Sequence, residues 1–152
     1  MTETKFVYTT YIARSTPELV WDALLKAEIT RRYWGHENRS DWQPGSPWQH
    51  VRDDAAHTVV LVGTVVEVEK PRRLVITWGD AADAADKSKH TRVTFELEAI
   101  DDMVRLTVTH DEFAGKPDML PKIANGWPRV LSSLKSYLET GRPLDTWAQS
   151  RS

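Results

Sequence analysis

The chain has 152 residues, of which 40% are hydrophobic and 28% charged, and its formal net charge at pH 7 is −2. These values exclude a disordered chain and are typical of one globular domain, predicted over residues 1–152. The slightly acidic charge argues against a nucleic-acid partner. With no signal-peptide pattern, no long apolar run and no cysteine, the sequence predicts a cytoplasmic protein without membrane partner or disulfides.

The first predicted elements are a strand and two short helices. Residues 6–13 are rich in aromatic and β-branched side chains, which is typical of a strand. Thr16 and Pro17 predict a helix start, because a hydroxyl caps free backbone N–H groups and proline fits the first turn. A second helix is predicted over about residues 28–34, with Gly35 as its left-handed cap.

The middle of the chain predicts a series of strands. Two short strands, about residues 40–42 and 48–52, flank a Pro-Gly turn. Residues 58–69 form a long Val-rich strand, in which Gly63 predicts a bulge or a close approach of another backbone. A further strand is predicted around residues 74–78.

The second half of the predicted sheet has the clearest pattern. A polar loop over residues 79–89, the best candidate for mobility, precedes two strands, 91–99 and 103–111. Hydrophobic and polar residues alternate along both strands, which indicates an antiparallel sheet that is covered on one face only. His110 falls on the covered face.

The C-terminal segment predicts the cover of this sheet. Apolar residues recur every three or four positions over residues 118–140, as on one face of a helix. Pro128 predicts a kink or break near residues 124–128, and Gly141 predicts the end of the helix. The core is therefore expected to span about residues 6–141, followed by an extended tail over residues 142–152.

The order of elements predicts an α+β fold. A curved antiparallel sheet of about six to seven strands wraps around the long C-terminal helix, with two short helices after the first strand. One helix cannot fill the curve of such a sheet, so an apolar cavity is expected between them. The chain has seven Trp residues, and the segment that holds four of them, residues 21–48, is expected to cover a surface or line a cavity.

An ordered set of motifs resembles a known family. The set covers about residues 6–141 and consists of Thr16-Pro17-Glu18-Leu19-Val20-Trp21-Asp22-Ala23-Leu24, Arg32-Tyr33-Trp34, Ser40-Asp41-Trp42, Gly45-Ser46-Pro47-Trp48, Pro71-Arg72-Arg73-Leu74, Leu106-Thr107-Val108-Thr109-His110 and Gly126-Trp127-Pro128. It is similar to the AHSA-type branch (activator of heat-shock protein 90 ATPase homologue-like) of the SRPBCC superfamily. The resemblance implies a helix-grip (START-like) fold with a deep hydrophobic pocket. The chain has no room for the additional N-terminal domain of the eukaryotic co-chaperone, so no chaperone partner is expected.

The candidate ligand-binding residues are those expected on the faces around the cavity: Tyr33, Trp34, Trp48, Trp78, Phe95, His110 and Trp127. For the aromatic residues the alternative is packing in the core, which is compatible with lining a pocket. His110 is expected either to orient a ligand or act as an acid or base, or to be buried against neighbouring backbone or Asp111-Glu112.

No cofactor, metal or catalytic residue is predicted. His36, His50 and His57 lack the i, i+4 spacing of a helical zinc motif and fall on different loops or strands. The chain has no Gly-rich phosphate loop and no nucleophile elbow.

The sequence therefore predicts a protein that binds a small hydrophobic or aromatic ligand in an internal apolar cavity. One alternative is a regulatory or chaperone-associated interaction module, as the family name implies. A second is a cyclase- or hydrolase-like enzyme that uses the pocket. Enzyme activity is not the favoured interpretation, and a homodimer is left open.

Overall fold

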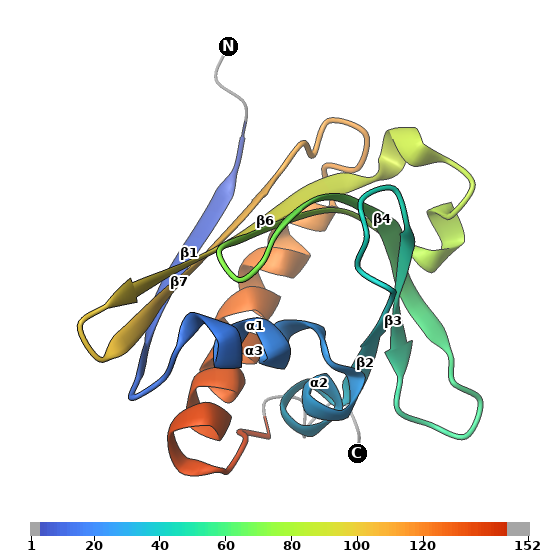
Figure 1. Cartoon of the computed structure of the whole chain (residues 1–152). Helices are drawn as coiled ribbons and strands as arrows, with labels where there is room; N and C mark the ends of the chain where they lie inside the picture. The colour runs from blue at the N-terminus through green and yellow to red at the C-terminus, as the bar shows by residue number, and fades with distance from the viewer. Residues whose placement is uncertain (1–3, 146–152) are drawn as a thin grey trace.

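The computed structural model describes residues 4–145, which form a curved seven-stranded sheet and three α-helices (Figure 1). The strand order is β1-β7-β6-β5-β4-β3-β2, and every neighbouring pair is antiparallel. The predicted α+β helix-grip fold is thus confirmed. None of the described helices is long and apolar enough to cross a membrane.

The N-terminal elements match their predicted positions. Strand β1 (Phe6–Ala13) is followed by helix α1 (Pro17–Leu25), and the Thr16 side chain accepts a hydrogen bond of 3.2 Å from the Leu19 N–H. Helix α2 (Ala27–Trp34) ends at Gly35, whose φ of 77° is the predicted left-handed cap. These capping residues set the sharp turns that bring α1 and α2 to one end of the curved sheet, beside α3 (Figure 1).

The next strand lies earlier in the chain than expected. The structure has β2 at His36–Arg39 and β3 at Pro47–Arg52, and the strand predicted over residues 40–42 is wrong. In this loop side chains hold the backbone: Ser40 Oγ accepts from the Trp42 N–H at 2.9 Å, and a carboxylate oxygen of Asp41 accepts from the Gln43 N–H at 3.1 Å. Such local bonds compete with pairing between strands.

Gly63 lies at a close crossing inside β4 (Val59–Glu69), which pairs with β3 and with β5 (Arg73–Asp80). A Cβ atom at this position would come within 2.0 Å of the Thr77 carbonyl oxygen and 2.3 Å of Trp48 Nε1. The predicted close approach is therefore present, whereas the irregularity in the β4–β5 pairing falls between Val65 and Glu67.

The segment predicted as a polar loop is more regular than expected. Its first two residues, Gly79 and Asp80, complete β5, and the short 3₁₀ turns η1 (Ala81–Asp83) and η2 (Lys87–Lys89) follow. The carboxylate of Asp83 forms an ion pair of 2.9 Å with Lys116. These contacts connect the segment to the chain that leads into the last helix.

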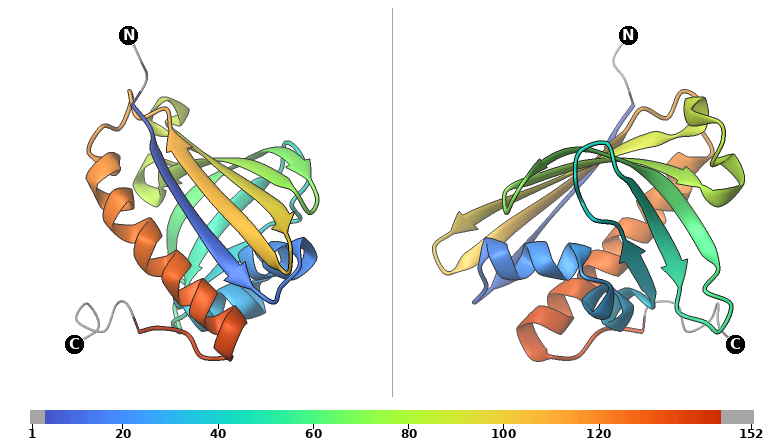
Figure 2. Two further views of the ribbon diagram at one scale, coloured as in Figure 1. Left: turned by 90° about the vertical axis from the view of Figure 1, so that its left-hand side faces the viewer. Right: turned by 45° about the vertical axis from the view of Figure 1, so that its right-hand side comes forward.

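Strands β6 (Thr91–Ile100) and β7 (Met103–Asp111) alternate as predicted between buried and more exposed side chains. Helix α3 (Met119–Thr140) crosses the inner face of the sheet diagonally (Figure 2). Pro128 lies inside this helix, which is one continuous element, so the predicted break at residues 124–128 is not found. Its buried stripe consists of Met119, Ile123, Trp127, Val130, Leu131, Ser133 and Leu134.

The chain after α3 folds back against that helix. Ser133 Oγ donates to the Tyr33 carbonyl oxygen at 2.7 Å and accepts from the Leu144 N–H at 3.0 Å. Residues 142–145 have no regular secondary structure. The rest of the predicted extended tail, residues 146–152, lies outside the described residues.

Replacing Gly63 by Ala is expected to lower the free energy of unfolding by about 2 kcal/mol, because the new methyl group would meet backbone and indole atoms that cannot both move away. The matched control is Gly126→Ala in α3, where an added Cβ meets nothing within 4 Å. This control is expected to gain about 0.5–1 kcal/mol from helix propensity. Urea unfolding followed by circular dichroism measures both, and equal stabilities of the two variants would contradict the assignment.

Candidate functional site

A cavity of about 290 Å³ lies where the β2–β5 side of the sheet faces the first half of α3. Six elements supply its walls, because the curve of the sheet brings the end of α2 and the strands β2 to β5 opposite α3. The lining residues are Trp34, His36, His50, Val60, Leu61, Trp78, Asp80, Met119, Lys122, Ile123, Gly126, Trp127 and Val130. Most of this lining is apolar or aromatic, as is usual for small-molecule sites.

Three indole rings from separate elements meet at this cavity. The ring centroids of Trp78 and Trp127 lie 5.2 Å apart, and the Trp34 ring lies 5.8 Å from Trp127 and 6.4 Å from Trp78. At these distances the rings pack directly against one another. They therefore form one joint aromatic wall rather than separate faces around a gap.

Two stacked imidazole rings lie in the same lining. The His36 and His50 ring centroids are 4.6 Å apart, with an interplanar angle of 9°. His50 Nδ1 lies 2.6 Å from Asn38 Oδ1, and His36 Nδ1 lies 3.2 Å from the Trp34 carbonyl oxygen. The Asn38 amide N–H group donates to the Leu24 carbonyl oxygen at 2.9 Å, which leaves its oxygen to accept from His50.

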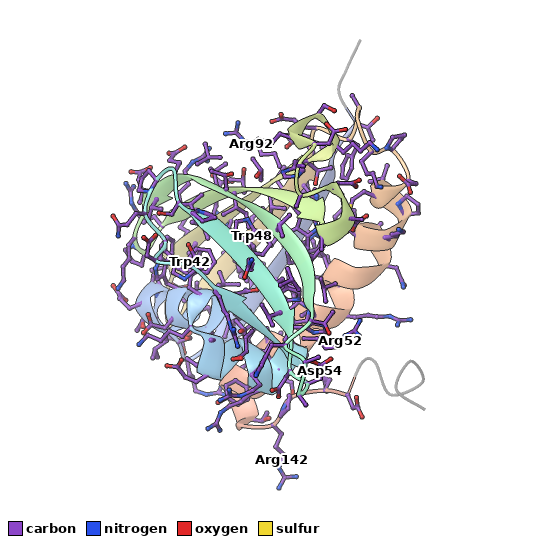
Figure 3. All side chains as sticks on the ribbon, turned by 90° about the vertical axis from the view of Figure 1, so that its right-hand side faces the viewer. Trp42, Trp48, Arg52, Asp54, Arg92 and Arg142 are labelled. Atoms are coloured by element: carbon purple, nitrogen blue, oxygen red, sulfur yellow. The ribbon has the colours of Figure 1, made fainter. Side chains whose placement is uncertain are left out.

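Burial keeps both of these rings neutral. Removal from water lowers the pKa of His50 well below its usual value, and the neighbouring His36 adds to this effect. Burial also lowers the pKa of His36; the Trp34 carbonyl opposes this, and Arg52 lowers the pKa while Asp54 raises it. Arg52 and Asp54 lie together at the end of the β3–β4 hairpin (Figure 3). The cavity thus contains neutral imidazoles near pH 7.

His110 is fully buried and has both ring nitrogens engaged. The Trp127 indole N–H donates to Nδ1 at 3.1 Å, so the proton of the neutral ring is on Nε2, 2.6 Å from Thr91 Oγ1. Thr91 in turn donates to the Trp78 carbonyl oxygen at 2.9 Å. Burial lowers the pKa of His110 to about 3. His110 does not line the cavity.

The structure separates the seven sequence-predicted site residues into two groups. Trp34, Trp78 and Trp127 line the cavity. Trp48 and Phe95 are buried under α1, where only about 10 Å³ remains open. Tyr33 is buried and donates from its hydroxyl to the Ala23 carbonyl oxygen at 2.7 Å, while His110 joins the sheet to α3.

His36 and His50 line one cavity, which the sequence pattern does not predict. They are diagonal neighbours across the β2–β3 pair, where His50 is opposite Asn38 and His36 is opposite Arg52. Only the correct limits of β2 reveal this pairing, and the sequence placed that strand four residues too late. In residues 4–145, no group of three His, Asp or Glu side chains is placed to hold a metal ion.

The arrangement of a curved antiparallel sheet, a long C-terminal helix laid across it and two short helices after the first strand defines a protein of the helix-grip class. Residues 14–139 match the family model of the Activator of Hsp90 ATPase homolog 1-like proteins. The chain belongs to this family, as its motifs predicted. No curated protein matches the chain.

Solved structures share the fold at low sequence identity. A protein from Bordetella parapertussis is 26% identical with a TM-score of 0.73, over 98% of this chain and 82% of that one. The Aha1 dimer from Colwellia psychrerythraea is 20% identical with a TM-score of 0.72, over 91% and 98% of the two chains. An HSP90 activator from Plasmodium falciparum is 21% identical with a TM-score of 0.68, over 91% and 97%.

The buried histidines predict a loss of stability in acid. Below a pH of about 6.5 the unfolded chain binds protons that the folded protein excludes, so the free energy of unfolding falls by up to about 1.4 kcal/mol per pH unit for each such ring. For His110 this fall continues to the folded-state pKa of about 3. Urea unfolding between pH 7 and 4.5 measures the slope.

His110→Gln is expected to be less stable than the wild type at pH 7, because one buried hydrogen-bonded contact is lost. Its free energy of unfolding is expected to fall less steeply as the pH is lowered. The control is His57→Gln, at an exposed position, which is expected to show the same dependence of the free energy of unfolding on pH as the wild type. If the His110 variant keeps the full slope, the buried neutral ring is not its source.

Proposed function

We propose that the protein binds a small apolar or aromatic molecule in the cavity between the sheet and α3. The observation that supports this most directly is the cavity of about 290 Å³ whose lining includes three indole rings. Burial of an apolar ligand surface there gains about 25 cal/mol for each Å² removed from water. The half-buried Trp34 ring offers a flat contact that suits a planar ring, and the more deeply buried Trp78 and Trp127 rings support it from behind.

The site favours binding over chemistry. Few polar groups line the cavity: two neutral imidazoles, the Asp80 carboxylate and the Lys122 ammonium group. The Asp80 carboxylate forms an ion pair with Lys116, with 3.6 Å between Oδ2 and Nζ. His110, the residue considered for acid–base work, is enclosed by Trp127 and Thr91. The ligand-binding role is therefore preferred to the cyclase- or hydrolase-like alternative.

The interaction-module alternative has a different kind of support. It depends on the family description and on the HSP90 activator among the solved structures, which at 21% identity shares the fold alone. A heat-shock protein 90 ATPase assay tests it: stimulation by this chain would favour the interaction role. The homodimer also stays a prediction, and sedimentation equilibrium measures it.

Titration with neutral naphthalenes such as 2-methoxynaphthalene is expected to shift the indole ¹H–¹⁵N resonances of Trp34, Trp78 and Trp127. Val60→Phe, which adds bulk to the cavity wall, is expected to weaken this binding about 10-fold or more, a loss of about 1.4 kcal/mol.

The matched control is Val66→Phe on the same strand, β4, at a position that is 43% exposed and outside the cavity. It is expected to bind like the wild type. If none of the neutral naphthalenes shifts the three indole resonances of the wild type, the ligand-binding proposal is wrong. Equal weakening in both variants would place the ligand elsewhere.

A further inference from the structure

We propose that the ligand carries an uncharged hydroxyl group, an alcohol or a phenol, which donates a hydrogen bond to Nε2 of His36 or His50. This inference rests on the proposed function and specifies the ligand class for the same cavity. It follows from which ring nitrogens carry protons, from what else lines the cavity and from the packing of the two rings.

The hydrogen-bond partners decide the state of each ring. A neutral imidazole has one N–H donor and one lone pair that accepts. Both Nδ1 atoms lie beside oxygen atoms that only accept, the Trp34 carbonyl and Asn38 Oδ1, so each Nδ1 carries the proton. Nε2 is then the acceptor in both rings. Across residues 4–145 neither Nε2 has a protein hydrogen-bond partner.

Both rings belong to the cavity lining, where they stack at 4.6 Å, and because each Nδ1 is bonded to a protein oxygen, Nε2 is the nitrogen of each ring that is left to meet a ligand. The ring of Trp34 packs on His50 from the other side, with centroids 4.4 Å apart. Both imidazoles are thus fixed in place by rings and by their Nδ1 bonds. A fixed acceptor in an apolar wall discriminates strongly, since a ligand without a donor leaves it unpaired after water is expelled.

The remaining polar groups favour a neutral donor over a charged one. A carboxylate on the ligand would place its own lone pairs against those of the imidazoles, and the ammonium group of the lining belongs to Lys122, which is at an exposed position of α3 and is therefore solvated. An ammonium group would need a free carboxylate in the cavity, and the Asp80 carboxylate already forms an ion pair with Lys116. Removing a charge from water without a counter-charge to pair with it is costly. A hydroxyl group supplies the hydrogen-bond donor that Nε2 needs and costs less to remove from water than a charged group.

Three naphthalenes test this by isothermal titration calorimetry at pH 7.5. 2-Naphthol has the donor, 2-methoxynaphthalene has the same oxygen without the donor, and 2-naphthylmethylamine is an ammonium ion. We expect 2-naphthol to bind at least 10-fold more tightly than either of the others. If 2-naphthol and 2-methoxynaphthalene bind equally, the inference is wrong while the proposed function stands. If neither binds, the proposed function fails. Tighter binding of the ammonium ion would overturn the hydroxyl assignment.

Variants locate the acceptor. His36→Phe, at a half-buried position, removes one lone pair and keeps a ring in the stack, so it is expected to reduce the preference for 2-naphthol while 2-methoxynaphthalene still binds. His57→Phe, at an exposed position, is the control and is expected to keep the full preference.

His50→Phe is less suitable, because it would leave Asn38 Oδ1 without its donor and weaken the fold. For His50 the ¹⁵N resonance of Nε2 is measured in the wild type instead. It is expected to move on addition of 2-naphthol and to stay when 2-methoxynaphthalene is added. The inference is overturned if neither imidazole Nε2 responds and His36→Phe keeps the full preference.

Discussion

The hydrogen bond from the Trp127 indole N–H to His110 Nδ1, at 3.1 Å, connects the long helix α3 to strand β7 of the sheet. Both partners are buried, so separating them would leave a donor and an acceptor without water or protein to satisfy them. The bond therefore fixes how α3 lies against β7. It also sets the Trp127 ring against Trp78 at 5.2 Å, which forms the aromatic wall of the cavity.

A second series of buried hydrogen bonds connects the short helices to the same cavity. The last carbonyl groups of a helix have no partner within the helix. In α1 the Tyr33 hydroxyl donates to the Ala23 carbonyl, and the Asn38 amide donates to that of Leu24. Asn38 then accepts from His50 at 2.6 Å. The end of α1 thus determines, through one amide, which nitrogen of a cavity imidazole keeps its lone pair.

Much of the fold was predictable because its signals are local. The hydroxyl of Thr16, Gly35 and the alternation along β6 and β7 each act over a few residues, and the structure confirms them. The position of β2 was not predictable in this way. The side chains of Ser40 and Asp41 accept hydrogen bonds from the nearby backbone N–H groups of Trp42 and Gln43, so residues 40–42 do not form a strand, and these bonds become visible only in the structure. That error concealed the His36–His50 pair, which requires the β2–β3 register.

The volumes of the inner side chains decide where the curved sheet leaves room. Over α1, Trp48 and Phe95 fill the space until only about 10 Å³ remains, although the sequence suggested these rings as pocket contacts. Toward β2 and the start of α3, smaller imidazole rings and Gly126 line about 290 Å³. The cavity consequently has two neutral imidazoles among its few polar groups, beside the ion-paired Asp80 and the exposed Lys122. A molecule that enters it meets hydrogen-bond acceptors within a largely apolar wall, and this is why the chemistry of the donor, rather than charge, would select the ligand.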